Sequence, residues 1–384
     1  PSSHNFPEYS ATLKNFNGSL YLGGNNGLFV WDSGEFRQIY ADKDVYAFEL
    51  TPKGLLIGTD KGLQLLDKNG KFHSLFSKGR VDLILSDRDN PNVVYYSHNA
   101  HALRKVILTS ETQFTDSKLV DFQEGGHTIT EDINGDLWVG TGRNGDLQFE
   151  TIQENNIIVS VSHVHKFTTE HGLPSNGFNY TMSVGNDVGF ITSDGFYRLN
   201  SERDSIIIDH RFDNVFFGQD RAVWPVVQDN NGGIWLAWAA AHIGKAVYNS
   251  EKDIFEWNDG EFTRTAPYRD IDFIYPTEKN RIYFQTFAQN LAYFDSSLYR
   301  QPLPIINAHI NSVLINSDSL LLEPRGLSHS VLETPISYQD NKIRFNYGMI
   351  AFLPEDRLFY QVKLEGLEDD WSPTTNERYR DYTN

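Results

Sequence analysis

Short hydrophobic stretches, most of them ending in a small residue before a polar loop, recur along the first 300 residues of the chain. They are LYLGG at 20–24, LLIGT at 55–59, VVYYS at 93–97, LWVGT at 137–141, VGFIT at 188–192, IWLAW at 234–238 and IYFQT at 282–286. Their starts lie 35, 38, 44, 51, 46 and 48 residues apart, close to the roughly 40–50 residues of a four-stranded propeller blade. The pattern therefore predicts seven repeated β units.

Turn signals precede several of these stretches. The segments are TEDINGDLW, VQDNNGGIW, ELTPKGLLI and KNFNGSLYL, in which Asn-Gly and Pro-Lys-Gly supply the positive φ angles that a tight hairpin needs. Each unit is expected to hold an inner strand, a hairpin, the recurring strand, a loop, a third strand and a variable outer strand. Since helical periodicity is absent and one blade cannot bury its faces alone, we predict an all-β, seven-bladed β-propeller over residues 1–300.

The repeat stops near residue 300. The segment 301–384 instead carries alternating strands in PIINAHINSVLIN and KIRFNYGMIAF, followed by RLFYQVKLEGLEDDWSPTTNERYRDYTN. Such a change of pattern predicts a second β domain over residues 301–384.

Three phrases carry a resemblance to a known family. The unit that fits IxEDxxGxLWxGT at 129–141 resembles the propeller repeat of two-component regulators, HGLPSN at 171–176 is similar to the phrase between their blades, and YQVKLEGLEDDW with RYRDYTN resembles the Y_Y_Y domain. Together the resemblance covers essentially the whole chain. It implies that 301–384 is a fibronectin-like or Ig-like sandwich and that the chain is a periplasmic sensor region.

In that family, the sensor belongs to a membrane-anchored regulator, commonly a hybrid histidine kinase that responds to oligosaccharides, and it dimerises through the Y_Y_Y domain. An output of the diguanylate-cyclase type is an alternative. Many members carry two propellers, and their Y_Y_Y domains run on through further strands. The chain opens on Pro1 and ends at Asn384, so we expect a C-terminally truncated piece of a longer protein.

Composition narrows the possible partners. The formal net charge is −18, which disfavours a nucleic-acid partner because a phosphate backbone needs clustered Lys and Arg. There are no cysteines, so disulfides and thiolate metal sites are excluded. No apolar run approaches the roughly 20 residues that span a bilayer, and no signal peptide is visible.

Catalytic motifs are not legible in the sequence. The acidic pairs Glu131 with Asp132 and Asp369 with Asp370 are best interpreted as a turn and a solvated loop. The histidines are scattered and predict no metal site, no GxSxG elbow occurs, and no cofactor is expected. The spacing of acidic residues in the sequence does not show whether two distant carboxylates lie close enough in the fold to act as a catalytic pair. A propeller lyase or glycoside-cleaving enzyme is therefore the alternative to a non-catalytic sensor.

A ligand site is predicted on the face where entry loops and second-to-third-strand loops emerge. The sixth unit departs from the repeat with the longer loop of IWLAWAAAHIGKAV, and the loops GQDRAVWP and TAPYRD flank it. Aromatic, amide, guanidinium and imidazole groups suit a sugar-like small molecule or oligosaccharide. The predicted ligand-binding residues are Arg221, Trp224, Trp238, His242, Tyr268, Arg269, Asn179, Tyr180 and His127.

A purely structural interpretation competes at several of these positions. Trp138 and Trp235 occupy matching places in the repeat and are expected to pack between blades. His127 and Tyr180 stand where a side chain can simply fill the axis. Arg221 and Arg269 each neighbour an aspartate that could serve as their ion-pair partner.

Overall fold

The computed structural model describes residues 10–295 and 308–383, with gaps. The gaps are 42, 216–222, 230, 239–241, 259–270, 278–280, 287–290, 317–318, 323–336, 338–341, 350–359, 369 and 373–374, and only the backbone is described at 10, 11, 224, 238, 242, 272, 286 and 319–322. The chain divides into two compact units, Pro1–Tyr299 and Arg300–Asn384.

In the described part of the first unit, the strands form seven antiparallel sheets, each built from consecutive strands. Blades 1 to 3 are β1 (Ser10–Phe16), β2 (Ser19–Gly24), β3 (Gly27–Asp32) and β4 (Glu35–Tyr40); β5 (Val45–Thr51), β6 (Gly54–Thr59), β7 (Gly62–Asp67) and β8 (Phe72–Phe76); and β9 (Ile84–Ser86), β10 (Val93–His98), β11 (Ala102–Leu108) and β12 (Phe114–Asp121). Blades 4 and 5 are β13 (Gly126–Glu131), β14 (Leu137–Thr141), β15 (Asp146–Glu154) and β16 (Ile157–Phe167); and β17 (Tyr180–Val184), β18 (Asp187–Thr192), β19 (Gly195–Leu199) and β20 (Ile206–Ile208). Blades 6 and 7 are β21 (Val223–Gln228), β22 (Ile234–Trp238), β23 (His242–Asn249) and β24 (Ile254–Asn258); and β25 (Ile271–Pro276), β26 (Arg281–Thr286) and β27 (Leu291–Asp295).

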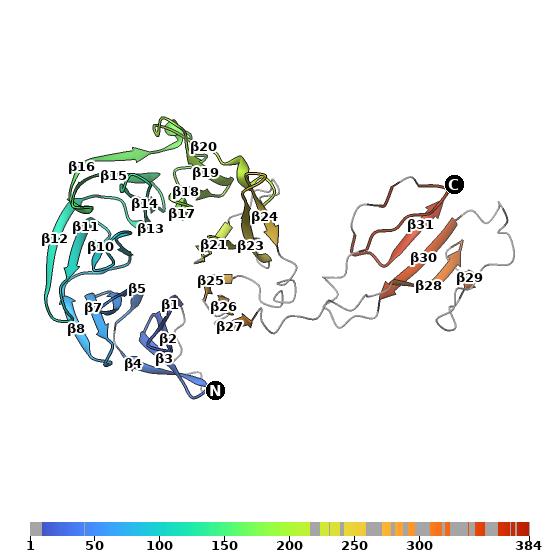
Figure 1. Ribbon diagram of the computed structural model, residues 1–384. Coiled ribbons are helices and arrows are strands. Elements are labelled where there is room, and N and C mark those ends of the chain that lie inside the picture. Colours follow the sequence, from blue (N-terminus) through green and yellow to red (C-terminus); the bar gives the residue numbers. More distant parts are fainter. Residues whose placement is uncertain are drawn as a thin grey trace. The chain divides into compact units, whose positions relative to one another are not determined.

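These sheets form a closed ring, the β-propeller that the repeat predicts (Figure 1). The inner strand of each blade contacts the inner strand of the next, and β25 contacts β1. At this last joint Leu13 and Leu22 belong to a core cluster that Phe273 and Tyr275 pack against, and the Tyr275 hydroxyl accepts a hydrogen bond from the Asn15 amide at 3.3 Å.

Each recurring hydrophobic stretch forms the second strand of its sheet, from β2 to β26. The predicted hairpin turns are present as well. Asn17 and Gly18 have φ angles of 51° and 78°, the backbone of a type I′ hairpin. Two short 3-10 helices, η1 (Thr169–His171) and η2 (His210–Phe212), interrupt the strands, and no α-helix occurs among the described residues.

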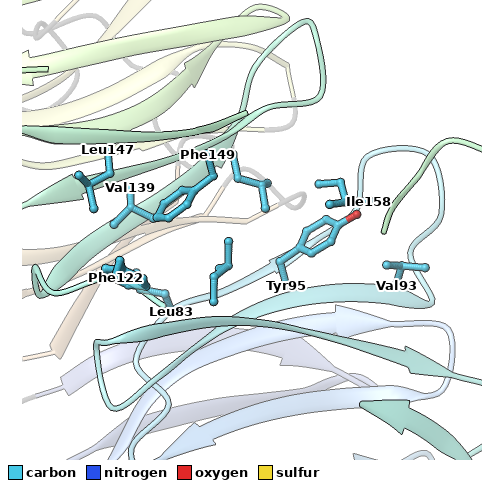
Figure 2. Packing of buried hydrophobic residues seen from close by; sticks show 10 residues of the cluster. Leu83, Val93, Tyr95, Phe122, Val139, Leu147, Phe149 and Ile158 are labelled. Carbon is cyan, nitrogen blue, oxygen red and sulfur yellow. The ribbon is translucent and has the colours of Figure 1, made fainter. Parts of the chain in front are cut away.

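Apolar side chains fill the spaces between neighbouring blades. Figure 2 shows the cluster between blades 3 and 4, where Tyr95 and Leu83 face Val139, Leu147 and Phe149. The predicted packing role of the two repeat tryptophans is confirmed. Trp138 and Trp235 are 0% and 5% exposed, and they belong to clusters that bridge blades 4 and 5 and blades 6 and 7.

The second unit contains a four-stranded antiparallel sheet in the order β29-β28-β30-β31. Its strands are β28 (Ala308–Ile315), β29 (Ser319–Leu322), β30 (Lys342–Met349) and β31 (Tyr379–Thr383). One cluster of its described side chains contains the buried Tyr347 and Tyr360, and Phe345, Met349 and Val362 pack against them.

Candidate functional site

The first acidic pair has a structural role in the hairpin at the end of an inner strand. The Asp132 carboxylate is fully buried and accepts hydrogen bonds from the backbone amides of Asn134 and Asp136 at 2.9 and 3.1 Å. It also accepts the indole N–H of Trp138 at 2.8 Å. The same Asp-to-aromatic bond recurs in blade 6, where Trp235 donates to Asp229 at 2.8 Å. The structural interpretation of this motif is confirmed.

The other three acidic residues of the two pairs are Glu131, Asp369 and Asp370. Burial raises the pKa of Glu131, and the Arg88 guanidinium donates to the Glu131 carbonyl at 2.9 Å. Asp370 is exposed, and Asp369 lies outside the described residues.

Threonines close the second-to-third-strand loops at the opposite end of the strands. The hydroxyls of Thr59 and Thr192 donate to the carbonyls of Gly62 and Gly195 at 2.9 and 3.0 Å, and Thr141 does the same to Gly145. The Gly-Thr ending of the recurring phrase is therefore part of the loop architecture.

Entry loops lie against these closed loops and form one face of the propeller, which we call the mouth. The backbone amide of Val81 donates to Thr59 at 2.9 Å, Asn99 donates to Arg80 at 2.8 Å, and Phe178 donates to Gly142 at 3.1 Å. This arrangement is the one that the strand order of the repeat predicts.

Only part of the predicted ligand site can be compared with the structure. Arg221, Tyr268 and Arg269 lie outside the described residues. Trp224 is in inner strand β21, with its backbone alone described. The backbones of Trp238 and His242 pair with each other as the last residue of β22 and the first of β23.

The predicted lengthening of the sixth loop is small. Three residues separate paired Trp238 and His242, as three separate His98 and Ala102 in blade 3. The corresponding loop of blade 2, between Thr59 and Gly62, has two.

The three predicted site residues whose side chains are described lie at blades 4 and 5. His127 is exposed, and its ring meets the Tyr180 ring edge-on with centroids 6.4 Å apart. Burial raises the pKa of Tyr180. Asn179 is fully buried, and its amide donates to the Ser175 carbonyl at 2.8 Å. Asn179 therefore supports the entry loop from below, whereas His127 is accessible to a ligand.

A buried carboxyl lies close behind this sector. Asp146 is fully buried at the start of β15, and burial raises its pKa to about 7. The Thr141 amide donates to one carboxyl oxygen at 3.4 Å, and the other oxygen has no hydrogen-bond partner among the described residues. The side chain is thus largely protonated at mildly acidic pH.

A depression of about 360 Å³ opens on the mouth between blades 3 and 4. It is lined by Arg80, Asp82, Asn99, Ala100, Gly125, Gly126 and His127. His127 is the predicted site residue that it includes. We call this depression the Arg80 pocket.

Arg80 is the principal charged group of the pocket. Its side chain is 51% exposed, and its Nε lies 3.1 Å from an oxygen of Asp82. The guanidinium carbon lies 4.1 Å from the centre of the Tyr46 ring in blade 2, the arrangement of a cation–π contact. The sequence did not single out Arg80, because Tyr46 is 34 positions away in the sequence and the two meet only where blade 3 packs against blade 2.

Sequence reasoning also overlooked a His-x-His pair. His163 and His165 alternate along outer strand β16, and each approaches the same Glu150 oxygen, at 3.2 and 3.4 Å. Even so, no set of three His, Asp or Glu side chains in the described ranges is arranged to hold a metal ion.

Comparison with known proteins gives results at the level of the fold. No family model matches the sequence, and no curated protein matches it. Among solved structures, the extracellular domain assigned to the hybrid two-component system BT3049 of B. thetaiotaomicron is similar with a TM-score of 0.66 at 17% identity, over 99% of this chain and 52% of that one. This chain therefore spans about half the length of that domain.

Two other solved structures are similar over a smaller share of this chain. Virginiamycin B lyase of Staphylococcus aureus has a TM-score of 0.53 at 12% identity over 76% of this chain and 96% of that one. PorZ, a surface component of the type-IX secretion system of Porphyromonas gingivalis, has a TM-score of 0.53 at 14% identity over 90% of this chain and 58% of that one. No helix in the described part of the chain has the length and hydrophobicity to cross a membrane. At these identities the likeness concerns the fold, which in this chain is a β-propeller over the first unit followed by a second β unit.

Proposed function

We propose that this chain is the extracytoplasmic, non-catalytic ligand-sensing part of a membrane-bound signal-transduction regulator. The observation that supports this function most is the likeness, along 99% of the chain, to the extracellular domain assigned to a hybrid two-component system. The ligand is a small polar molecule or oligosaccharide that binds at the mouth. The signal passes to a histidine kinase as output module. This part of the protein lies in the periplasm, and the intact, membrane-anchored protein dimerises through residues 301–384.

A panel of oligosaccharides tests this function. Binding is measured by thermal shift and calorimetry, and products are sought by chromatography of the same mixtures. A ligand present at 100 times its dissociation constant should stabilise the folded state by about 2.7 kcal/mol. Binding without any product supports a sensor, whereas turnover of a panel member overturns the non-catalytic role.

A propeller lyase is the second candidate, because virginiamycin B lyase shares the fold over 76% of this chain. The structure of that enzyme was determined with quinupristin, so this compound is the direct probe. A time-dependent change in the chromatographic retention of quinupristin would favour the lyase. If quinupristin is unchanged, the virginiamycin-lyase activity is excluded, and the sensor function remains the proposal.

A further inference from the structure

We propose that the Arg80 pocket binds the carboxylate of an acidic sugar, with the Arg80 guanidinium as its anion-binding group. This assignment rests on the proposed ligand-sensing function and names the ligand class for that face. It also places the ligand between blades 3 and 4, away from the sixth-blade loops that the sequence analysis favours.

The pocket has unused hydrogen-bond donors. Within the described part of the chain, Arg80 makes one side-chain contact to a carboxylate, from Nε to Asp82 at 3.1 Å. Its two terminal nitrogens donate to no described group. Both oxygens of Asp82 have a partner, because the second one accepts the Ser97 hydroxyl at 2.6 Å. Arg80 lines the pocket, and its guanidinium carries the paired N–H groups that match the two oxygens of a carboxylate.

Arg80 is held in place before any ligand arrives. Its backbone amide donates to the Asn99 side chain at 2.8 Å, and its carbonyl accepts the Asn99 amide at 2.8 Å. The Tyr46 ring supports the guanidinium from one side at 4.1 Å. The Asn99 bonds fix the backbone of Arg80, and Tyr46 and Asp82 hold its side chain. Binding therefore costs less conformational entropy than it would for a free arginine.

The shape and the charge of the pocket limit the size of the ligand group. Gly125 and Gly126 line the pocket without side chains, and the nearest group to a Cβ at Gly125 would be the Ala100 methyl at 4.0 Å. A volume of about 360 Å³ lies at the low end of small-molecule sites. A single positive charge beside Asp82, in a chain of net charge −18, favours one carboxylate over a multiply charged group.

Calorimetry with matched ligands tests the assignment. The probes are trigalacturonate, its fully methyl-esterified form, trimannuronate, a hyaluronan tetrasaccharide and a sulfated neutral disaccharide. We expect at least one uronate to bind and, for trigalacturonate, the acid to bind tenfold or more tightly than the ester. Equal affinity for acid and ester, preference for the sulfated sugar, or no binding by any uronate would overturn the assignment. Binding of neutral glycans alone would overturn it while leaving the sensor function intact.

Variants of the protein distinguish direct binding of the carboxylate by Arg80 from a general effect of the protein's net charge. Arg80→Gln should weaken uronate binding tenfold or more, and Arg80→Lys should restore only part of it because lysine lacks the fork. Arg37→Gln is the matched control, since Arg37 is another exposed arginine whose Nε lies near an aspartate, at 3.8 Å from Asp32. Unchanged affinity in Arg80→Gln, or an equal loss in Arg37→Gln, would show that the pocket does not bind the carboxylate.

Discussion

At the scale of single residues, one buried aspartate organises the turn between the first two strands of a blade. Asp132 accepts two turn amides and the Trp138 indole, and Arg203 from blade 5 donates to the same oxygen as the indole. Arg203 also pairs with Asp187 at 2.8 Å. One carboxylate therefore holds its own hairpin and the neighbouring blade.

Replacing Asp132 with alanine should lower the free energy of unfolding by about 3–5 kcal/mol, because the buried donors of Trp138 and Arg203 lose their acceptor. Urea denaturation measures this loss. Asp187→Ala is the matched control, since it removes the other partner of Arg203 at a side chain that is 42% exposed. That change should cost at most about 1 kcal/mol, and equal losses in both variants would contradict the role of Asp132.

The buried Asp146 carboxyl should make stability depend on pH. Its folded-state pKa is about 7, whereas an unfolded aspartate titrates near 4. Between these values the folded protein binds more protons than the unfolded chain, so stability falls as the pH rises and is retained below pH 4.

Asp146→Asn should remove that dependence while keeping the side-chain shape. Between pH 5 and pH 8, the wild type should lose about 2–3 kcal/mol of unfolding free energy relative to the variant. Urea denaturation at both pH values gives the comparison. A difference between the two proteins that is the same at both pH values would show that Asp146 ionises normally.

At the scale of elements, the loop between the second and third strands explains why glycine recurs in the repeat. Gly62 begins β7 with a φ of 129°, and a Cβ there would overlap the Phe76 carbonyl oxygen at the end of β8. Gly27 and Gly145 stand in the same relation to Tyr40 and Phe167. The residue at the start of the third strand must therefore lack a side chain, because the backbone of the outer strand occupies the position of its Cβ.

Gly62→Ala should lower the unfolding free energy by about 2–4 kcal/mol, because it adds a backbone clash to an unfavourable φ. Gly70 in the same blade is the control. It also has a positive φ of 80°, and nothing lies within 4 Å of its would-be Cβ, so Gly70→Ala should cost only about 1 kcal/mol. Thermal or urea unfolding of both variants measures the difference between the two losses of unfolding free energy. Equal losses would show that the clash with the Phe76 carbonyl does not affect stability.

The elements of the propeller were predictable because their signals are local. The recurring strands and the Asn17-Gly18 turn appear in the sequence as periods and dipeptides, and the structure has both. The Arg80 pocket was not predictable, because it depends on tertiary contacts between loops. Arg80 contacts Asn99 only when blade 3 has folded and Tyr46 only when blade 3 packs against blade 2, and no local sequence pattern encodes these contacts.

At the scale of the whole molecule, the two units differ in length. The first unit spans Pro1–Tyr299, and the second unit, Arg300–Asn384, is much shorter. Since a shorter chain buries a smaller fraction of its surface on folding, the second unit should be the less stable one.

Limited proteolysis should therefore separate the units near residues 298–303 before it opens a blade. Mass spectrometry of the fragments identifies the cut. Hydrogen exchange provides the second measurement. The amides of residues 342–383 should exchange faster than the amides of the inner strands of the propeller blades. Better protection of the second unit, or a first cut within residues 10–295, would reverse this order of stability.

The joint between β25 and β1 has a consequence for how the ring comes together. Every other pair of neighbouring blades is linked by the chain that runs directly from one sheet into the next. The bond from Asn15 to Tyr275 instead joins residues 260 positions apart. Closing so long a loop carries the largest entropic cost in the propeller, so blade 1 and blade 7 should meet late in folding. During synthesis, one apolar face of the first blade therefore stays exposed to solvent until the last blade has been synthesised. The nascent protein should be most prone to aggregation during this interval.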